Sequence, residues 1–103
     1  MVAQGEFWLF EPPNSKPRPV LVITRNEAIP VLNNVVVAPV TSTIRNIATN
    51  ILVGADEGLD HPSVASFDNL RVVPQAFLTR RLGGLNPLRL GEICRALQAL
   101  ADC

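Results

Sequence analysis

The stretch KPRPVLVI, residues 16–23, decides the fold. Its second half, residues 20–23, is a continuous run of apolar side chains, which is typical of a short strand covered on both faces. Just before this strand, Arg18 stands between two prolines. Pro17 fixes its own φ angle, and Pro19 keeps the arginine extended. A planar, permanently charged guanidinium held in this way suits a phosphate group, which it can meet with two parallel hydrogen bonds.

Further short strands are predicted on both sides of this one. Residues 6–10 are rich in aromatic side chains and residues 35–40 are mostly β-branched, so both segments favour strands. Residues 51–53 predict another strand. Residues 63–73 alternate and predict strand structure that a proline ends. A last short strand is predicted around Leu82, before a pair of glycines.

Only the C-terminal segment has a clearly helical pattern. Asn86 is a typical helix N-cap, and Pro87 suits the first helical position. Apolar side chains then recur at the 3.6-residue period at Leu90, Ile93, Cys94, Leu97 and Leu100. We therefore predict a single α+β domain over residues 1–103, a small, strongly bent, barrel-like sheet with a C-terminal amphipathic helix laid over it.

The composition excludes several kinds of site. The formal net charge is zero, so a nucleic acid would have to bind a local patch; residues 61–103 carry five arginines against three acidic residues. The single histidine excludes a pair of catalytic imidazoles and a multi-histidine metal site. Asp56, Glu57 and Asp60 share one loop, which we interpret as a solvated turn rather than a cation site. We expect no metal and no cofactor.

The sequence also predicts a cellular compartment. Residues 1–6 lack the basic and apolar stretches of a secretory signal, and no apolar run is long enough to cross a bilayer. The two cysteines, Cys94 and Cys103, lie close together near the end, unlike the spread framework of a small secreted protein. We therefore expect a cytoplasmic protein with reduced thiols and no contact with membranes.

Hydroxyl side chains follow the predicted strand at residues 35–40, beginning with Thr41 and Ser42. If this strand and the one after Arg18 are antiparallel neighbours, the start of one and the end of the other lie at the same edge of the sheet. Arg18 and Thr41 would then face one pocket. The alternative is that Arg18 only begins a strand and that the hydroxyl residues only form a turn.

Five segments of the chain carry a family resemblance: GEFWLFEPP (5–13), RPVLVITRN (18–26), VVVAPVTST (35–43), PSVASFDNLRVV (62–73) and RLGGLNP (81–87). In this order and at these distances, they resemble the MazF/PemK (Kid) toxins of bacterial toxin–antitoxin systems. The resemblance implies a small, bent, mainly antiparallel barrel-like sheet with helices, and usually a homodimer. It also implies a cognate antitoxin, whose acidic and largely disordered C-terminal segment folds on binding.

The activity implied by the resemblance is metal-independent cleavage of single-stranded RNA, chiefly mRNA, at short sequences. The ribose 2′-OH attacks, and the products are a 2′,3′-cyclic phosphate and a 5′-OH. The resemblance implies that Arg18 is catalytic and that Thr41 has a role, with Ser42 assisting. Because the pKa of an arginine side chain lies far above neutral pH, the side chain stays protonated, and stabilising the charge on the scissile phosphate is favoured over general-base catalysis.

RNA recognition is implied for the loop between the first two strands and for the sheet face. The candidates are Asn14, Ser15, Lys16 and Asn69, with ordinary loop solvation as the alternative. Arg71 fits a structural salt bridge better than an RNA contact, and His61 fits a loop position. The loop at residues 11–16 is shorter and richer in proline than is common in the family. The recognised RNA sequence therefore does not follow from the resemblance.

Two other functions fit the same fold. CcdB toxins bind DNA gyrase, cut nothing, and depend on a tryptophan near the end of the C-terminal helix. Here the sole tryptophan is Trp8, which favours the nuclease. A homologue that has lost activity would persist only as an antitoxin-binding partner, and the presence of Arg18, Thr41 and Ser42 argues against this. The natural RNA target (mRNA, tRNA or rRNA) stays open.

Overall fold

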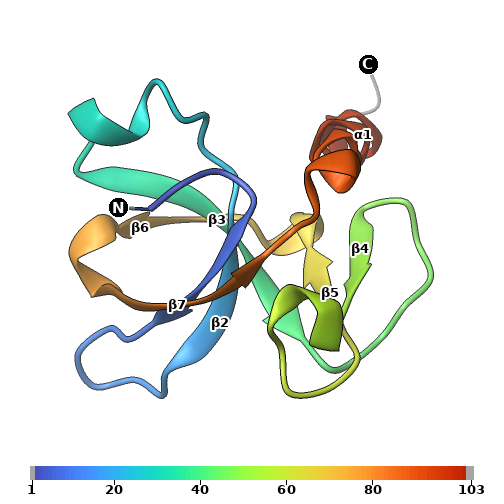
Figure 1. Cartoon of the computed structure of the whole chain (residues 1–103), viewed down its shortest axis with the longest axis horizontal. Coiled ribbons are helices and arrows are strands. Elements are labelled where there is room, and N and C mark those ends of the chain that lie inside the picture. The colour runs from blue at the N-terminus through green and yellow to red at the C-terminus, as the bar shows by residue number, and fades with distance from the viewer. Residues whose placement is uncertain (1, 102–103) are drawn as a thin grey trace.

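The computed structural model describes residues 2–101 and shows a curled antiparallel sheet with one α-helix near the C-terminus (Figure 1). The predicted α+β architecture is confirmed. The strands and the helix are β1 (Glu6–Phe10), β2 (Arg18–Val22), β3 (Asn34–Thr41), β4 (Asn50–Val53), β5 (Ser63–Ser66), β6 (Arg71–Pro74), β7 (Leu78–Gly84) and α1 (Gly91–Ala101). Short 3₁₀ turns connect them at η1 (Ile29–Val31), η2 (Ala55–Glu57), η3 (Phe67–Asn69), η4 (Gln75–Phe77) and η5 (Pro87–Arg89).

The strands follow the order β4-β5-β3-β2-β1-β7, and β6 pairs with β3 as well. Strand β3 is the longest and organises the bend. One of its edges pairs with β2, while β6 and β5 pair with successive parts of β3, β6 with its first half and β5 with its end. In Figure 1, β6 and β5 therefore lie at opposite ends of β3, and α1 lies above β4 and β5.

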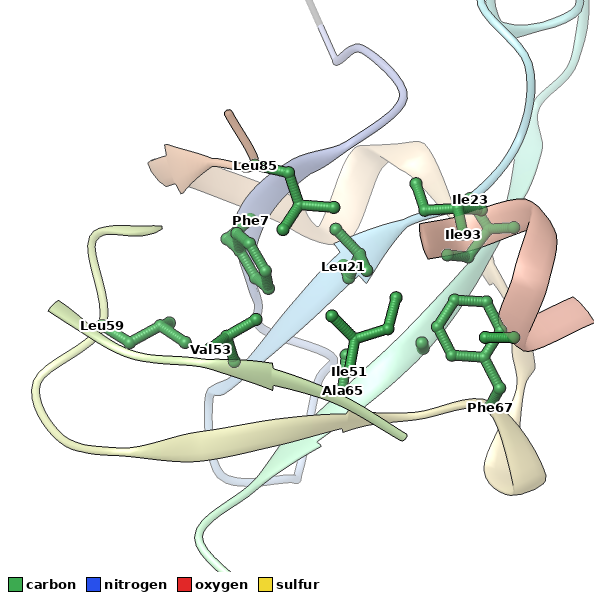
Figure 2. Packing of buried hydrophobic residues seen from close by; sticks show 12 residues of the cluster. Phe7, Leu21, Ile23, Ile51, Val53, Leu59, Ala65, Phe67, Leu85 and Ile93 are labelled. Carbon is green, nitrogen blue, oxygen red and sulfur yellow. The ribbon is translucent and has the colours of Figure 1, made fainter. Parts of the chain in front are cut away.

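The central strand β2 is buried on both faces, as its continuous apolar run predicts. Successive side chains of a strand point to opposite faces, so Leu21 and Ile23 enter one core while Val20 and Val22 enter another. The first core lies under α1 and contains Phe7, Phe67 and Ile93 among others (Figure 2). The second core contains Phe10, Ile29, Val35, Val37, Val73 and Leu78.

Several element boundaries differ from the sequence-based predictions. Strand β7 is seven residues long, whereas only a short strand around Leu82 was expected. The predicted continuous segment 63–73 is interrupted by η3 between β5 and β6. The Asn86 side chain does accept a hydrogen bond from the Leu88 N–H at 2.9 Å, but it caps the 3₁₀ turn η5 rather than α1. The thiol of Cys94 is exposed instead of joining the buried stripe of the helix.

The turn η2 crosses strand β7 at very short range. Gly58, with φ of 91°, follows η2, and a Cβ atom there would lie 2.1 Å from the carbonyl oxygen of Leu82. A Cβ atom on Gly83 would lie 2.0 Å from the carbonyl oxygen of Glu57. The two backbones therefore touch only because both positions lack side chains.

An arginine ties the turn to the start of the helix. The buried Glu57 carboxylate meets Arg89 Nη1 at 3.0 Å, and it accepts the Gly54 N–H at 2.6 Å. Arg89 also binds Glu92, with Nε to Oε2 at 2.7 Å, and donates to the Leu52 carbonyl oxygen at 2.6 Å. These contacts fasten β4, η2 and α1 to one another.

Candidate active site

Arg18 and Thr41 lie at the same edge of the sheet. Strands β2 and β3 are antiparallel, with Val20 opposite Pro39, and continuing this register places Arg18 opposite Thr41. Arg18 is the first residue of β2 and Thr41 the last residue of β3, and both are exposed. The juxtaposition that the sequence predicts for these residues is therefore present.

Two open clefts meet at this edge. The first, here called the β6 cleft, has a volume of about 710 Å³ and is lined by Arg71 and Val73 of β6. The second, the β7 cleft, has a volume of about 930 Å³ and is lined by Arg80 and Leu82 of β7. Arg18, Val40 and Thr41 line both clefts. A chain-like ligand passing from one cleft to the other would cross the Arg18–Thr41 edge.

Both clefts have a surplus of positive charge, although the net charge of the chain is zero. The β6 cleft contains Arg18, Arg45 and Arg71 against one carboxylate, Asp68. The β7 cleft contains Lys16, Arg18, Arg80 and Arg81 against Asp60. Among residues 2–101, only Arg81 of these cations forms an ion pair. The local patch required of a nucleic-acid binder is therefore present.

The expected salt bridge of Arg71 is absent from the described part of the chain. Instead, the Arg71 guanidinium carbon lies 5.7 Å from the centroid of the Phe10 ring, within the range of a cation–π contact. Phe10 is also the partner of Arg18 across the β1–β2 pair. The buried ring therefore lies beside the Arg71 guanidinium, and Phe10, Arg18 and Arg71 all line the β6 cleft.

Thr41 is oriented by the turn that follows it. Its Oγ1 accepts a hydrogen bond from the N–H of Thr43 at 3.2 Å. The Thr41 hydroxyl proton has no acceptor among the described residues, so it can be donated to a ligand. Ser42 lines the β7 cleft beside it.

The structure separates the four residues for which RNA recognition was expected. Lys16 lines the β7 cleft, and Asn69 lines the β6 cleft, where its Nδ2 donates to Ser66 Oγ at 2.9 Å. Asn14, with φ of 64°, and Ser15 lie in an exposed turn that lines neither cleft.

The acidic trio that was considered for a cation does not converge. Glu57 is buried against Arg89, while Asp56 and Asp60 are exposed. Within residues 2–101, no three His, Cys, Asp or Glu side chains are close enough to hold a metal ion. No helix in the same residues is long and apolar enough to span a bilayer.

Comparison with known proteins identifies the family. The sequence model described as "PemK-like, MazF-like toxin of type II toxin-antitoxin system" matches residues 3–101. The chain belongs to this family. It is similar to "Probable endoribonuclease MazF5" of Mycobacterium tuberculosis, with 39% identity, covering 98% of this chain and 94% of the relative. It is also similar to "Endoribonuclease MazF3" of the same species, with 49% identity over 68% of each chain.

Solved structures agree with the family assignment. The "Mycobacterium tuberculosis toxin MazF-mt6" superposes with a TM-score of 0.86 at 37% identity, covering 94% of this chain and 96% of that chain. An "Endoribonuclease in complex with its cognate antitoxin from Mycobacterial species" has a TM-score of 0.85 at 22% identity, covering 99% of this chain and 96% of that chain. This second likeness shows the fold alone.

Several residues of this PemK/MazF-like toxin line the clefts without having been expected there. Arg45 lies in the loop after β3, Arg80 lies on β7, and His61 lies in the loop before β5. No local sequence pattern distinguishes these residues. Arg45 and His61 lie in loops beside other lining residues, and Arg80 reaches the β7 cleft through the pairing of β7 with β1. The excess of arginine in the C-terminal part of the sequence is the only signal that points to Arg80.

Next to the β7 cleft, the Glu6 carboxylate neutralises one arginine. Burial alone would raise the pKa of Glu6, but hydrogen bonds from Trp8 Nε1, Arg81 Nε and the Ala3 N–H together hold this pKa below its usual value. Glu6 therefore stays ionised at neutral pH and pairs with Arg81 at 2.7 Å. Arg80, beside it on β7, has no such partner within residues 2–101.

Proposed function

We propose that this protein is a metal-independent endoribonuclease toxin that cleaves single-stranded RNA at short sequences. The observation that carries the proposal is that Arg18 and Thr41 lie together at the edge shared by two positively charged clefts. Membership of a family of toxins and the names of the curated relatives support RNA as the substrate. The scissile phosphate would lie at this edge, with the flanking nucleotides in the two clefts.

The RNA itself supplies the nucleophile for this reaction. The ribose 2′-OH gives its proton to water, its oxygen bonds to phosphorus, and the bond from phosphorus to the 5′ oxygen breaks as that oxygen takes up a proton from water. The products are a 2′,3′-cyclic phosphate and a 5′-OH. Arg18 stabilises the negative charge on the non-bridging oxygens, and Thr41 donates its hydroxyl proton to one of them, with Ser42 assisting.

The same geometry supports a set of proposed RNA-binding residues. Lys16 and Asn69 would contact nucleotides on either side of the cut, since they line different clefts. Asn14 and Ser15 lie in an exposed turn, and they would contact RNA only beyond the clefts. Arg45 and Arg71 add positive charge to the β6 cleft.

We further propose two protein partners. The family description implies a cognate antitoxin, and an acidic segment of that protein would complement the same positively charged clefts. A homodimer is expected from the family, and large apolar side chains that are exposed in the single chain, such as Val31, Val72 and Leu88, are available for such contacts. We also propose that the protein acts in the cytoplasm, where its proposed RNA substrate is found.

The test is cleavage of a long single-stranded RNA by purified protein in the presence of EDTA, with the fragment ends mapped. We expect discrete cuts with 5′-OH ends, and we expect none with Arg18→Ala. Arg25→Ala is the matched control, because Arg25 is exposed and lines neither cleft. Cleavage by Arg18→Ala at the wild-type rate would refute the role of Arg18. No cleavage by the wild type, under conditions where a curated relative cuts, would refute the proposed activity.

A further inference from the structure

Two adjacent arginines of β7 line the β7 cleft but differ in their electrostatic surroundings. Arg80 and Arg81 are both exposed. Arg81 donates from Nε to the Glu6 carboxylate at 2.7 Å, and the depressed pKa of Glu6 keeps that partner charged. No carboxylate lies within ion-pair distance of Arg80 in the described part of the chain.

Strand pairing places Arg80 on the face of the sheet that lines the β7 cleft. Arg80 pairs with Leu9 across β1 and β7, and residues directly opposite one another in an antiparallel pair share a face of the sheet. Leu9 lines the same cleft. The strand pairing therefore directs Arg80 to the cleft, whereas the bond to Glu6 already engages Arg81.

Other groups in the β7 cleft suit the same ligand. Lys16 approaches from the loop before β2 without an ion pair among residues 2–101, and Ser42 presents a hydroxyl. The titratable and charged groups that line the cleft are Lys16, Arg18, Arg80, Arg81, Asp60 and His61. Cations and hydroxyl donors are the side chains that contact phosphate oxygens of nucleic acids in a sequence-independent way. Their arrangement continues from the Arg18–Thr41 edge.

We infer that Arg80 and Lys16 form a subsite for a backbone phosphate of the RNA flanking the cut, with Arg80 as its principal cation. This inference rests on the proposed function and adds a residue that positions the strand without reading its bases. Arg81 is not part of the subsite, because its charge is neutralised by Glu6. The subsite holds one flank of the RNA in the β7 cleft while the other flank lies in the β6 cleft.

The test compares Arg80→Gln with Arg81→Gln. Each change removes one positive charge, and the two positions are neighbours on one strand, so both variants alter the long-range electrostatic field alike. They differ in that Arg81 is paired with Glu6 whereas Arg80 has no ion pair among residues 2–101. Affinity is measured for an RNA that carries a 2′-deoxynucleotide at the mapped cut, so that binding is separated from cleavage. Thermal melts of both variants verify that each is folded.

We expect Arg80→Gln to weaken RNA binding several-fold and to reduce the slope of log affinity against log salt by about 0.7, the value for one phosphate contact on a single strand. Arg81→Gln should leave that slope unchanged. Shortening the RNA on one side of the cut should abolish the difference between Arg80→Gln and the wild type, and shortening it on the other side should not. This result would identify which flank of the RNA contacts Arg80. It would not arise if Arg80 only stabilised the fold.

Three outcomes would overturn the inference. Equal effects of the two variants would mean that only the overall charge matters. An Arg80→Gln effect that persists on every truncated RNA would mean that the residue acts through the fold. Unchanged RNA binding combined with weaker binding of a synthetic polyglutamate peptide would assign the cleft to an acidic protein segment. Failure of the wild type to bind or cut any RNA would instead refute the proposed function itself.

Discussion

Replacing Gly83 with alanine should destabilise the protein severely, because η2 crosses β7 with no room for a side chain. The added Cβ would lie 2.0 Å from the carbonyl oxygen of Glu57 and 2.7 Å from its carbonyl carbon. Ordinary Cβ contacts begin at 3.4 Å, so the two backbone segments would have to separate by about 1.4 Å. Neither segment is a flexible side chain that can move aside at little cost.

Overpacking of this kind costs about 1–3 kcal/mol of unfolding free energy, and a backbone obstacle places Gly83→Ala at the upper end, about 3 kcal/mol. For a domain of this size, that loss corresponds to a fall in Tm of about 12–24 °C. Thermal unfolding followed by far-UV circular dichroism measures it. The variant should also bind RNA more weakly, since Gly58 and Leu82 line the β7 cleft.

Gly54→Ala is the matched control for this prediction. Its added Cβ would lie 3.7 Å from the Cα of Pro62, an ordinary contact, and the φ of Gly54 is −177°, which any residue adopts. We expect its stability to stay within about 0.5 kcal/mol of the wild type. If Gly83→Ala melted at the same temperature as Gly54→Ala, the close crossing of η2 and β7 would be refuted.

Three further predictions follow from the site and the ion pairs. Thr41→Val keeps the shape of the side chain but removes the proposed phosphate donor, so kcat should fall about a hundred- to a thousand-fold with an unchanged Tm; a wild-type kcat would exclude the donor role. Arg89→Leu leaves the buried Glu57 carboxylate without its cation and should cost about 2 kcal/mol in urea unfolding, and no loss would mean that the pair is not formed. Hydrogen bonds from Arg89 lower the pKa of Glu92 by more than burial raises it. The pKa of Glu6 is also lower in the folded state than usual. Their contribution to stability is therefore complete above the ordinary glutamate pKa of about 4.3 and is lost as the pH falls through the lower folded values; a urea midpoint that rises on acidification from pH 5 would contradict this.

The local sequence predicts the centre of this fold well. An uninterrupted apolar run of only four residues, 20–23, is too short for a helix of its own and is typical of a short buried strand. The opposition of Arg18 and Thr41 follows once two such strands are taken as antiparallel neighbours. The Arg18–Thr41 edge was predictable because it depends on one pairing between strands that are adjacent along the chain.

Strand β7 and the two clefts depend on contacts between residues that are far apart in the sequence. Strand β7 is polar at Thr79, Arg80 and Arg81 and ends in glycines, so it carries no strand pattern of its own; pairing with β1 makes it a strand. The β6 cleft lies where β3 passes from its pairing with β6 to its pairing with β5, and the β7 cleft combines residues from β1, β2, β3 and β7. Arg80 was missed for this reason, since most of its neighbours in the β7 cleft are far from it in sequence, whereas Arg45 lies in a loop without a distinguishing pattern.

The central claim is that the RNA is cut by its own 2′-OH at the Arg18–Thr41 edge. The most direct measurement uses two oligonucleotides that span a mapped cut and differ only in a 2′-deoxy substitution at the nucleotide on its 5′ side. We predict that the all-ribose strand is cleaved to a 2′,3′-cyclic phosphate and a 5′-OH, while the substituted strand stays intact and competes for binding. Cleavage of the substituted strand at the same position would contradict the account.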